Sequence, residues 1–293
     1  MSGKRILVAT DGSNDAGRAI DWIADFPLPA DASIEVVNAV RLPFPMDQIV
    51  ALGWQEFLAE SERVVAEARR RLEKRWPTVG GRVLEGDPRK VIVDAATKAG
   101  SDLIVLGARG LGAVASFLLG SVSIGVTRHA SCPVLVCRGA ARPVRSVTIA
   151  VDSSDDARAA VEYFAGLPLP SGLRVRLVGV VEPLRYPTSA PGFIGNTLRA
   201  AMQDFENESR QHLEAALAPL AAMLRSRVQD VVTTTPTGQP AATILREAEL
   251  NDSDVIVVGA RGLGVLERVA LGSVSEAVLR HAPCPVLVVR PRG

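Results

Sequence analysis

The chain repeats itself, and this repeat constrains the fold more than any other feature. The stretch GARGLGAVASFLLGSVS at 107–123 returns as GARGLGVLERVALGSVS at 259–275. Positions from Gly86 to Cys132 recur 152 residues later, whereas those around Asp11 recur 141 residues later. Each half has the size of an ordinary domain and is far longer than a solenoid repeat. We therefore expect two tandem domains, residues 1–141 and 142–293.

Short apolar runs alternate with amphipathic segments in both halves. The expected strands are 6–9, 34–40, 82–85, 103–106 and 134–137, then 147–151, 175–181, 228–235, 255–258 and 286–289. Four helices are expected in each half. In the first half they begin after Ser13, cover 54–75, begin at Pro88 and follow Ser121. In the second half they begin after Ser154, cover about 196–225, begin at Pro240 and follow Ser273. Such alternation is typical of parallel sheets covered by helices on both faces. The sequence predicts an α/β fold of two doubly wound domains, each with a five-stranded parallel sheet.

Functional residues gather at one edge of each predicted sheet. Ligands of open parallel sheets bind outside the carboxyl ends of the strands, where the strand order reverses. Asp11 follows the first strand, Ala39 lies near the end of the second, and Gly107 follows the fourth. We expect a binding site at this edge in each half.

The glycine stretch suits an anion. In the first half one group of backbone amides lies in the turn from Gly107 to Gly112, and another at the helix start from Gly120 to Ser123. Amides at a helix N-terminus and the helix dipole together bind anions, and glycine lets the backbone approach a phosphate. The serines can add hydroxyl donors. Asp11 would repel a bare phosphate, so it favours a ligand with a ribose hydroxyl or a bridging divalent cation.

Other phosphate motifs fit less well. The chain has no GxxxxGK[ST] sequence, which argues against a P-loop NTPase of the usual form. Residues 110–115 match the looser GxGxxA dinucleotide pattern, but the repeated copy ends in Glu267. The dinucleotide pattern also belongs after the first strand, whereas here it follows the fourth. Nicotinamide or flavin dinucleotide binding is therefore disfavoured.

The composition limits which partners the protein can bind and in which compartment it can lie. The formal net charge is +1, from 33 Lys and Arg against 32 Asp and Glu, so we expect no nucleic-acid surface and no membrane attachment. No apolar run approaches the length of a transmembrane helix, and Asp11 interrupts the N-terminal run too early for a signal peptide. The three cysteines form no CxxC pair and are interpreted as buried, reduced thiols. A cytoplasmic location is expected.

These motifs resemble those of the universal stress protein family, in its ATP-binding branch. The shared order is an aspartate at the first strand tip, then Gly-x-x-Gly-x9-Gly-Ser-Val-Ser, then a closing Pro-Val-Leu-Val strand, and it covers both halves as in a tandem member. The resemblance implies an adenine nucleotide alpha-hydrolase-like fold in which the closing strands of the two domains pair. It also implies ATP, ADP or AMP, with Mg²⁺, in each half. A homodimer is a further expectation.

The resemblance also implies roles for individual residues. Asp11 and Asp152 would contact ribose, phosphate or the nucleotide-bound Mg²⁺. Ala39 and Val180 would meet adenine through backbone groups. The expected phosphate site comprises Gly107, Gly110, Gly120, Ser121, Val122 and Ser123 in the first half, and Gly259, Gly262, Gly272, Ser273, Val274 and Ser275 in the second. The second half has 11 more residues than the first, near Pro183–Gly195, and these could change access to its site.

The expected function is regulatory: an ATP-binding protein of the stress response with slow ATP hydrolysis at most. A hydrolase needs a base or a water-positioning group near the terminal phosphate, and no such group recurs in both halves. Arg109 and Arg261 are the repeated cations of the motif and are interpreted as turn residues or phosphate contacts. Two alternatives remain open: an ATP-using adenylyl- or phosphotransferase on the same scaffold, and an interaction scaffold without nucleotide.

Overall fold

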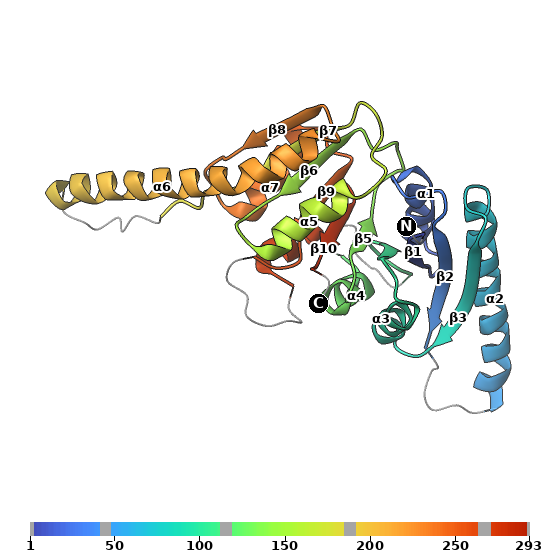
Figure 1. Ribbon diagram of the computed structural model, residues 1–293. Helices are drawn as coiled ribbons and strands as arrows, with labels where there is room; N and C mark the ends of the chain where they lie inside the picture. Colours follow the sequence, from blue (N-terminus) through green and yellow to red (C-terminus); the bar gives the residue numbers. More distant parts are fainter. Residues whose placement is uncertain (1–2, 42–47, 112–118, 185–191, 263–270, 292–293) are drawn as a thin grey trace.

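A single continuous sheet runs through the protein. The computed structural model describes residues 3–41, 48–111, 119–184, 192–262 and 271–291, and within them ten strands follow the order β3-β2-β1-β4-β5-β10-β9-β6-β7-β8 (Figure 1). All neighbours are parallel except β5 and β10, which are antiparallel and join the two halves. The predicted parallel sheets and the pairing of the closing strands are confirmed.

The elements recur in the same order in both halves. The first half contains β1 (Arg5–Ala9), α1 (Asn14–Asp25), β2 (Ser33–Val40), α2 (Gln48–Leu72), β3 (Val79–Glu85), α3 (Pro88–Ala99), β4 (Leu103–Gly107), α4 (Ser121–His129) and β5 (Val134–Cys137). The second half contains β6 (Ser146–Ala150), α5 (Asp155–Ala165), β7 (Arg174–Val178), α6 (Gly192–Arg225), β8 (Asp230–Thr234), α7 (Pro240–Leu250), β9 (Val255–Gly259), α8 (Ser273–His281) and β10 (Val286–Val289).

Local signals set most helix ends. Ser13 caps α1 by accepting a hydrogen bond from the Ala16 amide, and Ser154 caps α5 in the same way. Helix α3 starts with Pro88 at its first position and ends at Gly100, which adopts the left-handed conformation with φ 58°. These boundaries agree with the expected ones because each depends on residues adjacent in sequence.

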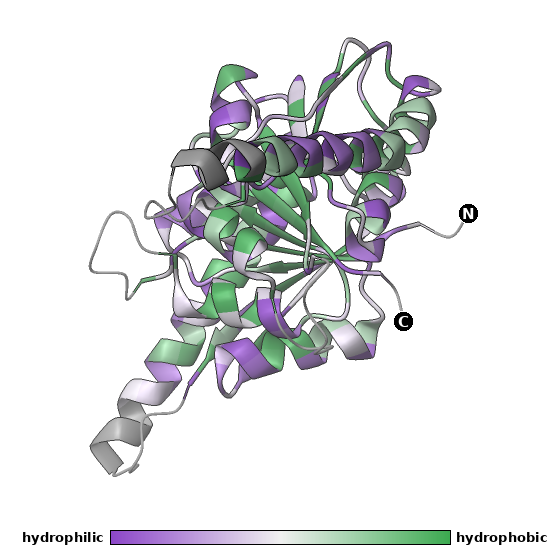
Figure 2. Ribbon diagram, turned by 90° about the vertical axis from the view of Figure 1, so that its left-hand side faces the viewer, coloured by the Kyte–Doolittle hydropathy of each residue, from purple (hydrophilic) through white to green (hydrophobic). Residues whose placement is uncertain are grey.

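Helices cover both faces of the sheet, so each face has its own apolar core. One core joins sheet residues such as Ile6 and Val36 to α1, α2, α5 and α6, and the other joins residues such as Leu7 and Val37 to α3, α4, α7 and α8. Figure 2 shows the central strands as hydrophobic and the outer faces of the helices as mixed. Each core extends across both halves. The β5–β10 seam is therefore packed on both sides.

Strand β7 differs from its expected extent. It ends at Val178, and Val181 makes only an isolated bridge with Thr237. A Cβ at Gly179 would lie 2.6 Å from Cδ2 of Leu213 on α6, so α6 packs directly against the backbone that follows β7. Part of the inserted segment, residues 185–191, falls outside the described residues.

Candidate functional site

A cavity of about 540 Å³ opens at the carboxyl edge of the first-domain strands. This volume lies within the usual range of small-molecule sites. Its lining includes every residue predicted for the first site: Asp11, Ala39, Gly107, Gly110, Gly120, Ser121, Val122 and Ser123. Apolar lining comes from residues such as Ile92, Leu106 and Leu119. The structure thus brings together residues that are up to 112 positions apart in the sequence.

Helix α4 begins at the cavity without a side-chain cap. Its N-cap is Gly120, which offers no side-chain hydrogen bond, in contrast to the Ser13 cap of α1. The amides of Ser121, Val122 and Ser123 are the first of the helix, and such amides have no intrahelical acceptor. Since these residues line the cavity, the positive end of the helix dipole faces it. This end of the cavity is suited to an anion.

The preceding turn is less open than the sequence indicated. The Ala108 amide donates to Cys137 O at 2.8 Å, the Gly120 amide to Ala108 O at 2.8 Å, and the Leu111 amide to Asp11 Oδ2 at 2.9 Å. Three amides near the expected phosphate site are therefore already bonded within the protein. The first amides of α4, which have no intrahelical acceptor, are therefore better placed than these three to meet an anion. Residues 112–118, which include Gly112, fall outside the described residues.

The buried serine of the motif has a structural bond. Ser123 Oγ donates to Gly107 O at 2.8 Å, and Ser275 Oγ donates to Gly259 O at 2.6 Å in the second domain. A hydroxyl has one proton to donate. The structure thus differs from the expectation that these hydroxyls serve a phosphate: they fix the start of α4 or α8 to the end of β4 or β9. Ser121 is exposed, and within the described residues its hydroxyl makes no such bond.

Two glycines of the motif are needed because other atoms of the protein lie where a Cβ would be. A Cβ at Gly110 would lie 2.4 Å from Oδ2 of Asp11, so glycine here makes room for the carboxylate. A Cβ at Gly107 would lie 2.6 Å from the backbone carbon of Asp15. Gly107 therefore lets α1 pack against the end of β4, a structural role that the phosphate interpretation did not include.

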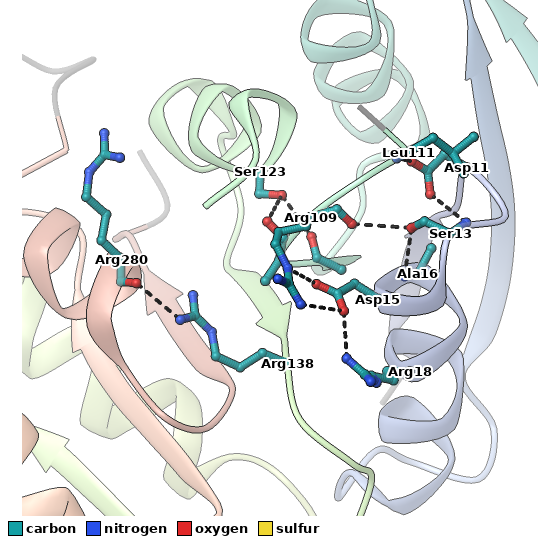
Figure 3. Close-up of polar contacts among 12 residues, drawn as sticks. Asp11, Ser13, Asp15, Ala16, Arg18, Arg109, Leu111, Ser123, Arg138 and Arg280 are labelled. Carbon is teal, nitrogen blue, oxygen red and sulfur yellow. Dashed lines mark hydrogen bonds and ion pairs between the residues drawn. The ribbon is translucent and has the colours of Figure 1, made fainter. Parts of the chain in front are cut away.

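An ion pair that the sequence analysis missed joins the glycine turn to α1 (Figure 3). Arg109 Nε lies 2.8 Å from Asp15 Oδ2, and the Asp15 side chain is 6% exposed. In the second domain Arg261 forms the same pair with Asp156, at 2.9 Å. Both partners recur through the repeat, and this recurrence is the signal that could have identified the pair. Arg109 and Arg261 thus anchor the turn to the adjacent helix.

Asp15 makes the first-domain pair sensitive to acid. Burial raises the pKa of Asp15, but the hydrogen bond and charge of Arg109, with those of Arg18, outweigh it and hold the pKa below its usual value. A carboxyl with a lower pKa in the folded state contributes stability above its unfolded pKa, and this contribution is lost as pH falls through the folded pKa.

We therefore expect Asp15→Asn to lower the free energy of unfolding by about 1–2 kcal/mol at pH 7 and by less at pH 3, which lies below the ordinary carboxyl pKa of 3.8. Urea unfolding at both pH values measures the difference. The matched control is Asp94→Asn, which removes an exposed pair with Lys90 and should have little effect at pH 7. An equal loss for Asp15→Asn at both pH values would show that the charge of Asp15 is not what stabilises the turn.

The second domain repeats the same local geometry. The Ser154 amide donates to Asp152 Oδ1 at 3.0 Å, as the Ser13 amide does to Asp11 Oδ1 at 3.0 Å. A Cβ at Gly262 would lie 2.7 Å from Asp152 Oδ2, and α8 begins after an uncapped Gly272. Ser273, Val274 and Ser275 supply the first amides of α8, while Val180 lies beyond the end of β7. Residues 263–270 fall outside the described residues.

Other expectations concern cysteines, metals and membranes. Cys132, Cys137 and Cys284 are buried and form no disulfide, as predicted. Within the described residues no group of three or more His, Cys, Asp or Glu side chains is placed to hold a metal ion. None of the helices in the described ranges has the length and apolarity needed to cross a bilayer.

Comparison with known proteins identifies relatives along the whole chain. The profile of the universal stress protein family matches residues 3–138 and again 143–290. A universal stress protein of Mycolicibacterium smegmatis is 30% identical over 303 residues, covering 98% of this chain and 97% of that protein. One of Mycobacterium tuberculosis is 28% identical over 315 residues, covering 97% of this chain and 94% of the relative.

The fold agrees with these sequence matches. The crystal structure of a universal stress protein from Archaeoglobus fulgidus gives a TM-score of 0.69 at 23% identity and covers 100% of both chains. The family profile matches each half once, and both matches contain the glycine motif and the strand-tip aspartate. The chain belongs to the universal stress protein family and is a tandem member with two copies of the family fold.

Proposed function

We propose that each domain binds an adenine nucleotide, ATP first among them, and that the bound state regulates protein partners in the stress response. The observation that carries the proposal is the first-domain cavity, which joins apolar walls, one carboxylate and an uncapped helix start in a single space. A nucleotide has an apolar base, a ribose with hydroxyls and an anionic end. The three kinds of lining match these three parts.

The phosphates would lie at the start of α4. The amides of Ser121, Val122 and Ser123 supply donors, and no cap side chain at Gly120 accepts a hydrogen bond from them. The corresponding donors in the second domain are Ser273, Val274 and Ser275. Gly107 and Gly259 would contribute indirectly, by allowing α1 and α5 to pack beneath the site.

Asp11 would meet the ribose or a magnesium ion. Its two carboxylate oxygens accept from the amides of Ser13 and Leu111, at 3.0 and 2.9 Å, which fixes their orientation. Each oxygen retains a lone pair for a ribose hydroxyl or a cation. Proteins commonly bind Mg²⁺ through one or two carboxylates together with substrate phosphates, so a single carboxylate per site is sufficient. Asp152 would have this role in the second domain.

The adenine would contact the apolar part of the cavity. Ala39, near the end of β2, lines it together with Ile92 and Leu106. Val180 corresponds to Ala39 in the second domain and is a larger residue. We expect the base to be bound through van der Waals contact and strand-end backbone groups in both domains.

ATP hydrolysis is expected to be slow at most, because the arginines of the glycine motif are already paired with carboxylates. Arg109 and Arg261 are each engaged by a carboxylate, Asp15 or Asp156, and Arg109 lines the first cavity in this paired position. An arginine that accelerates phosphoryl transfer must instead reach the transferring phosphate. We therefore propose that the protein regulates its partners through nucleotide binding, and not that it transfers a phosphoryl or adenylyl group. If the chain is an ATP-using enzyme, metal-dependent loss of ATP will be measurable and will disappear in Asp11→Asn, Asp152→Asn.

The test is the identity of the ligand. Small molecules released from the purified protein are analysed by mass spectrometry, and the melting temperature is measured with ATP, ADP, AMP, adenosine and GTP, with and without Mg²⁺. We expect an adenine nucleotide in the released fraction and a stabilisation that follows ligand concentration, about 2.7 kcal/mol at 100 times Kd. Protein that releases no nucleotide and shows no shift with any of them would favour the scaffold alternative.

A further inference from the structure

Two arginines reach across the boundary between the domains. Arg138 directly follows β5 and Arg290 directly follows β10, and the two are 152 positions apart, as expected for equivalent positions in the repeat. Strands β5 and β10 pair in antiparallel fashion, from Val286 opposite Val136 to Val288 opposite Val134. Each arginine therefore lies at the end of its own strand, beside the other domain. Each domain thus places one arginine against the other domain.

Arg290 binds the carboxyl end of α4. Its Nη2 donates to Thr127 O at 2.9 Å and to Arg128 O at 2.7 Å. Carbonyls in the last helical turn have no intrahelical partner, and a cation there also interacts favourably with the helix dipole. Burial lowers the pKa of Arg290, but an arginine side chain keeps its charge in proteins. A second-domain arginine thus caps a first-domain helix.

Arg138 makes the same contact with α8. Its Nη1 donates to Ala282 O at 2.8 Å and to Arg280 O at 3.3 Å, and its Nη2 donates to Leu279 O. Figure 3 shows the Arg138 side chain directed toward the Arg280 carbonyl of the other domain. Burial lowers the pKa of Arg138 as well. The two caps are therefore equivalent in both position and chemistry.

Both capped helices are short, and both begin at a candidate nucleotide site. Helix α4 has 9 residues, as has α8. At 1.5 Å per residue, the two ends of such a helix are about 13 Å apart, so a displacement of one end moves the other. Ser123 ties the amino end of α4 to Gly107 of its own domain, whereas Arg290 ties the carboxyl end to the other domain. The position of the phosphate-facing amides depends on both ties.

We propose that Arg290 and Arg138 are positioning residues that act crosswise. Arg290, from the second domain, holds the first site in its binding geometry, and Arg138, from the first domain, holds the second site. The inference rests on the proposed nucleotide sites. Each site then depends on the correct pairing of the two domains, because the opposite arginine is delivered by the strand that forms the seam.

Hydrogen exchange tests the positioning without any ligand. Amide exchange is measured in peptides covering 121–129 and 273–281. Because Arg128 of α4 also pairs with Glu276 of α8, at 2.6 Å, the two helices are in direct contact. We expect Arg290→Gln to raise exchange more in 121–129 than in 273–281, Arg138→Gln to do the reverse, and Arg290→Lys, which keeps the charge, to restore part of the protection. Arg142→Gln is the control, since Arg142 contacts Asp252 and Ser253 and neither helix. Unchanged exchange in 121–129, or equal changes in both peptides, would overturn the proposal.

Affinity tests the consequence for binding. ATP is titrated into two parent variants, Ser273→Pro to report on the first site and Ser121→Pro to report on the second. We expect Arg290→Gln to weaken the first site about three- to tenfold and Arg138→Gln to weaken the second similarly, with Arg290→Lys near its parent. Affinity within twofold of the parents would overturn the crosswise coupling. Parents that bind no ATP while the exchange pattern holds would contradict the nucleotide assignment and leave the helix positioning supported.

Discussion

Replacing Gly107 by alanine is expected to lower the free energy of unfolding by about 1–3 kcal/mol. The new Cβ would lie 2.6 Å from the Asp15 carbonyl carbon and 2.7 Å from the Ala16 amide nitrogen, so α1 would have to move. Backbone atoms yield less readily than the tip of a side chain. Gly259→Ala should behave alike, since its Cβ would lie 2.8 Å from the Asp156 backbone carbon. Thermal and urea unfolding measure the loss.

Gly110→Ala is the matched comparison. Its Cβ would lie 2.4 Å from a carboxylate oxygen of Asp11, a side-chain atom in a half-exposed position. We expect little loss of stability but weakened nucleotide binding in the first site, because Asp11 must leave the cavity wall. If Gly107→Ala is as stable as the parent, the close approach of α1 does not explain that glycine. A substitution at Gly107 is therefore expected to change the free energy of unfolding, and any change in nucleotide affinity would follow from that.

Replacing Ser121 by proline is expected to weaken ATP binding in the first site about 10- to 100-fold. Proline removes the first amide of α4, and a hydrogen bond to a charged group contributes enough free energy for a change of this size. The substitution suits the backbone: Gly120 has φ −65° and ψ 146°, the region that residues before proline adopt. Proline at the first position also occurs naturally in α3 and α7.

Ser121→Ala is the control, because it removes the hydroxyl and keeps the amide. We expect its affinity to lie within a few-fold of the parent and the melting temperatures of both variants to stay near it. Equal weakening by alanine and proline would assign the contact to the hydroxyl. Wild-type affinity in Ser121→Pro, measured by calorimetry with ATP, would show that the start of α4 is not the phosphate site.

The sequence predicted those parts of the fold whose signals are local. Ser13 and Ser154 cap helices next to them, Gly100 ends α3, and the apolar runs become the strands of the sheet. The repeat strengthened each assignment, since every element was encoded twice. The extent of β7 was mispredicted because Val178 and Val181 belong to one apolar run, whereas the packing of Leu213 against Gly179 depends on the path of a distant helix.

The sequence predicted which residues line the candidate site, but not which hydrogen bonds and ion pairs they form. The sequence brought Asp11, Gly110 and Ser121 to one edge of the sheet, and all three line the cavity. It did not reveal that Ser123 bonds the strand end, nor that Arg109 pairs with a carboxylate 94 positions away. Such partners are set by how α1 packs on β4. Only the repetition of the two charges in both halves indicates the pair beforehand.

The arginine caps could not be predicted from the sequence alone. Arg138 and Arg290 follow the closing strands in both halves, but a cation after a strand has no defined partner in the sequence. Their acceptors are backbone carbonyls of the other domain, which become neighbours only when β5 pairs with β10. Contacts that depend on the assembly of the domains therefore require the structure.

Titration of ATP with Mg²⁺ into the double variant Ser121→Pro, Ser273→Pro, beside the wild type and Ser121→Ala, Ser273→Ala, tests the central claim most directly. Calorimetry should show binding of two nucleotides per chain in the wild type and the alanine variant, and binding weakened about 10- to 100-fold at both sites in the proline variant, with all three proteins folded. Wild-type binding by the proline variant would contradict the claim that the amides at the starts of α4 and α8 hold the nucleotide.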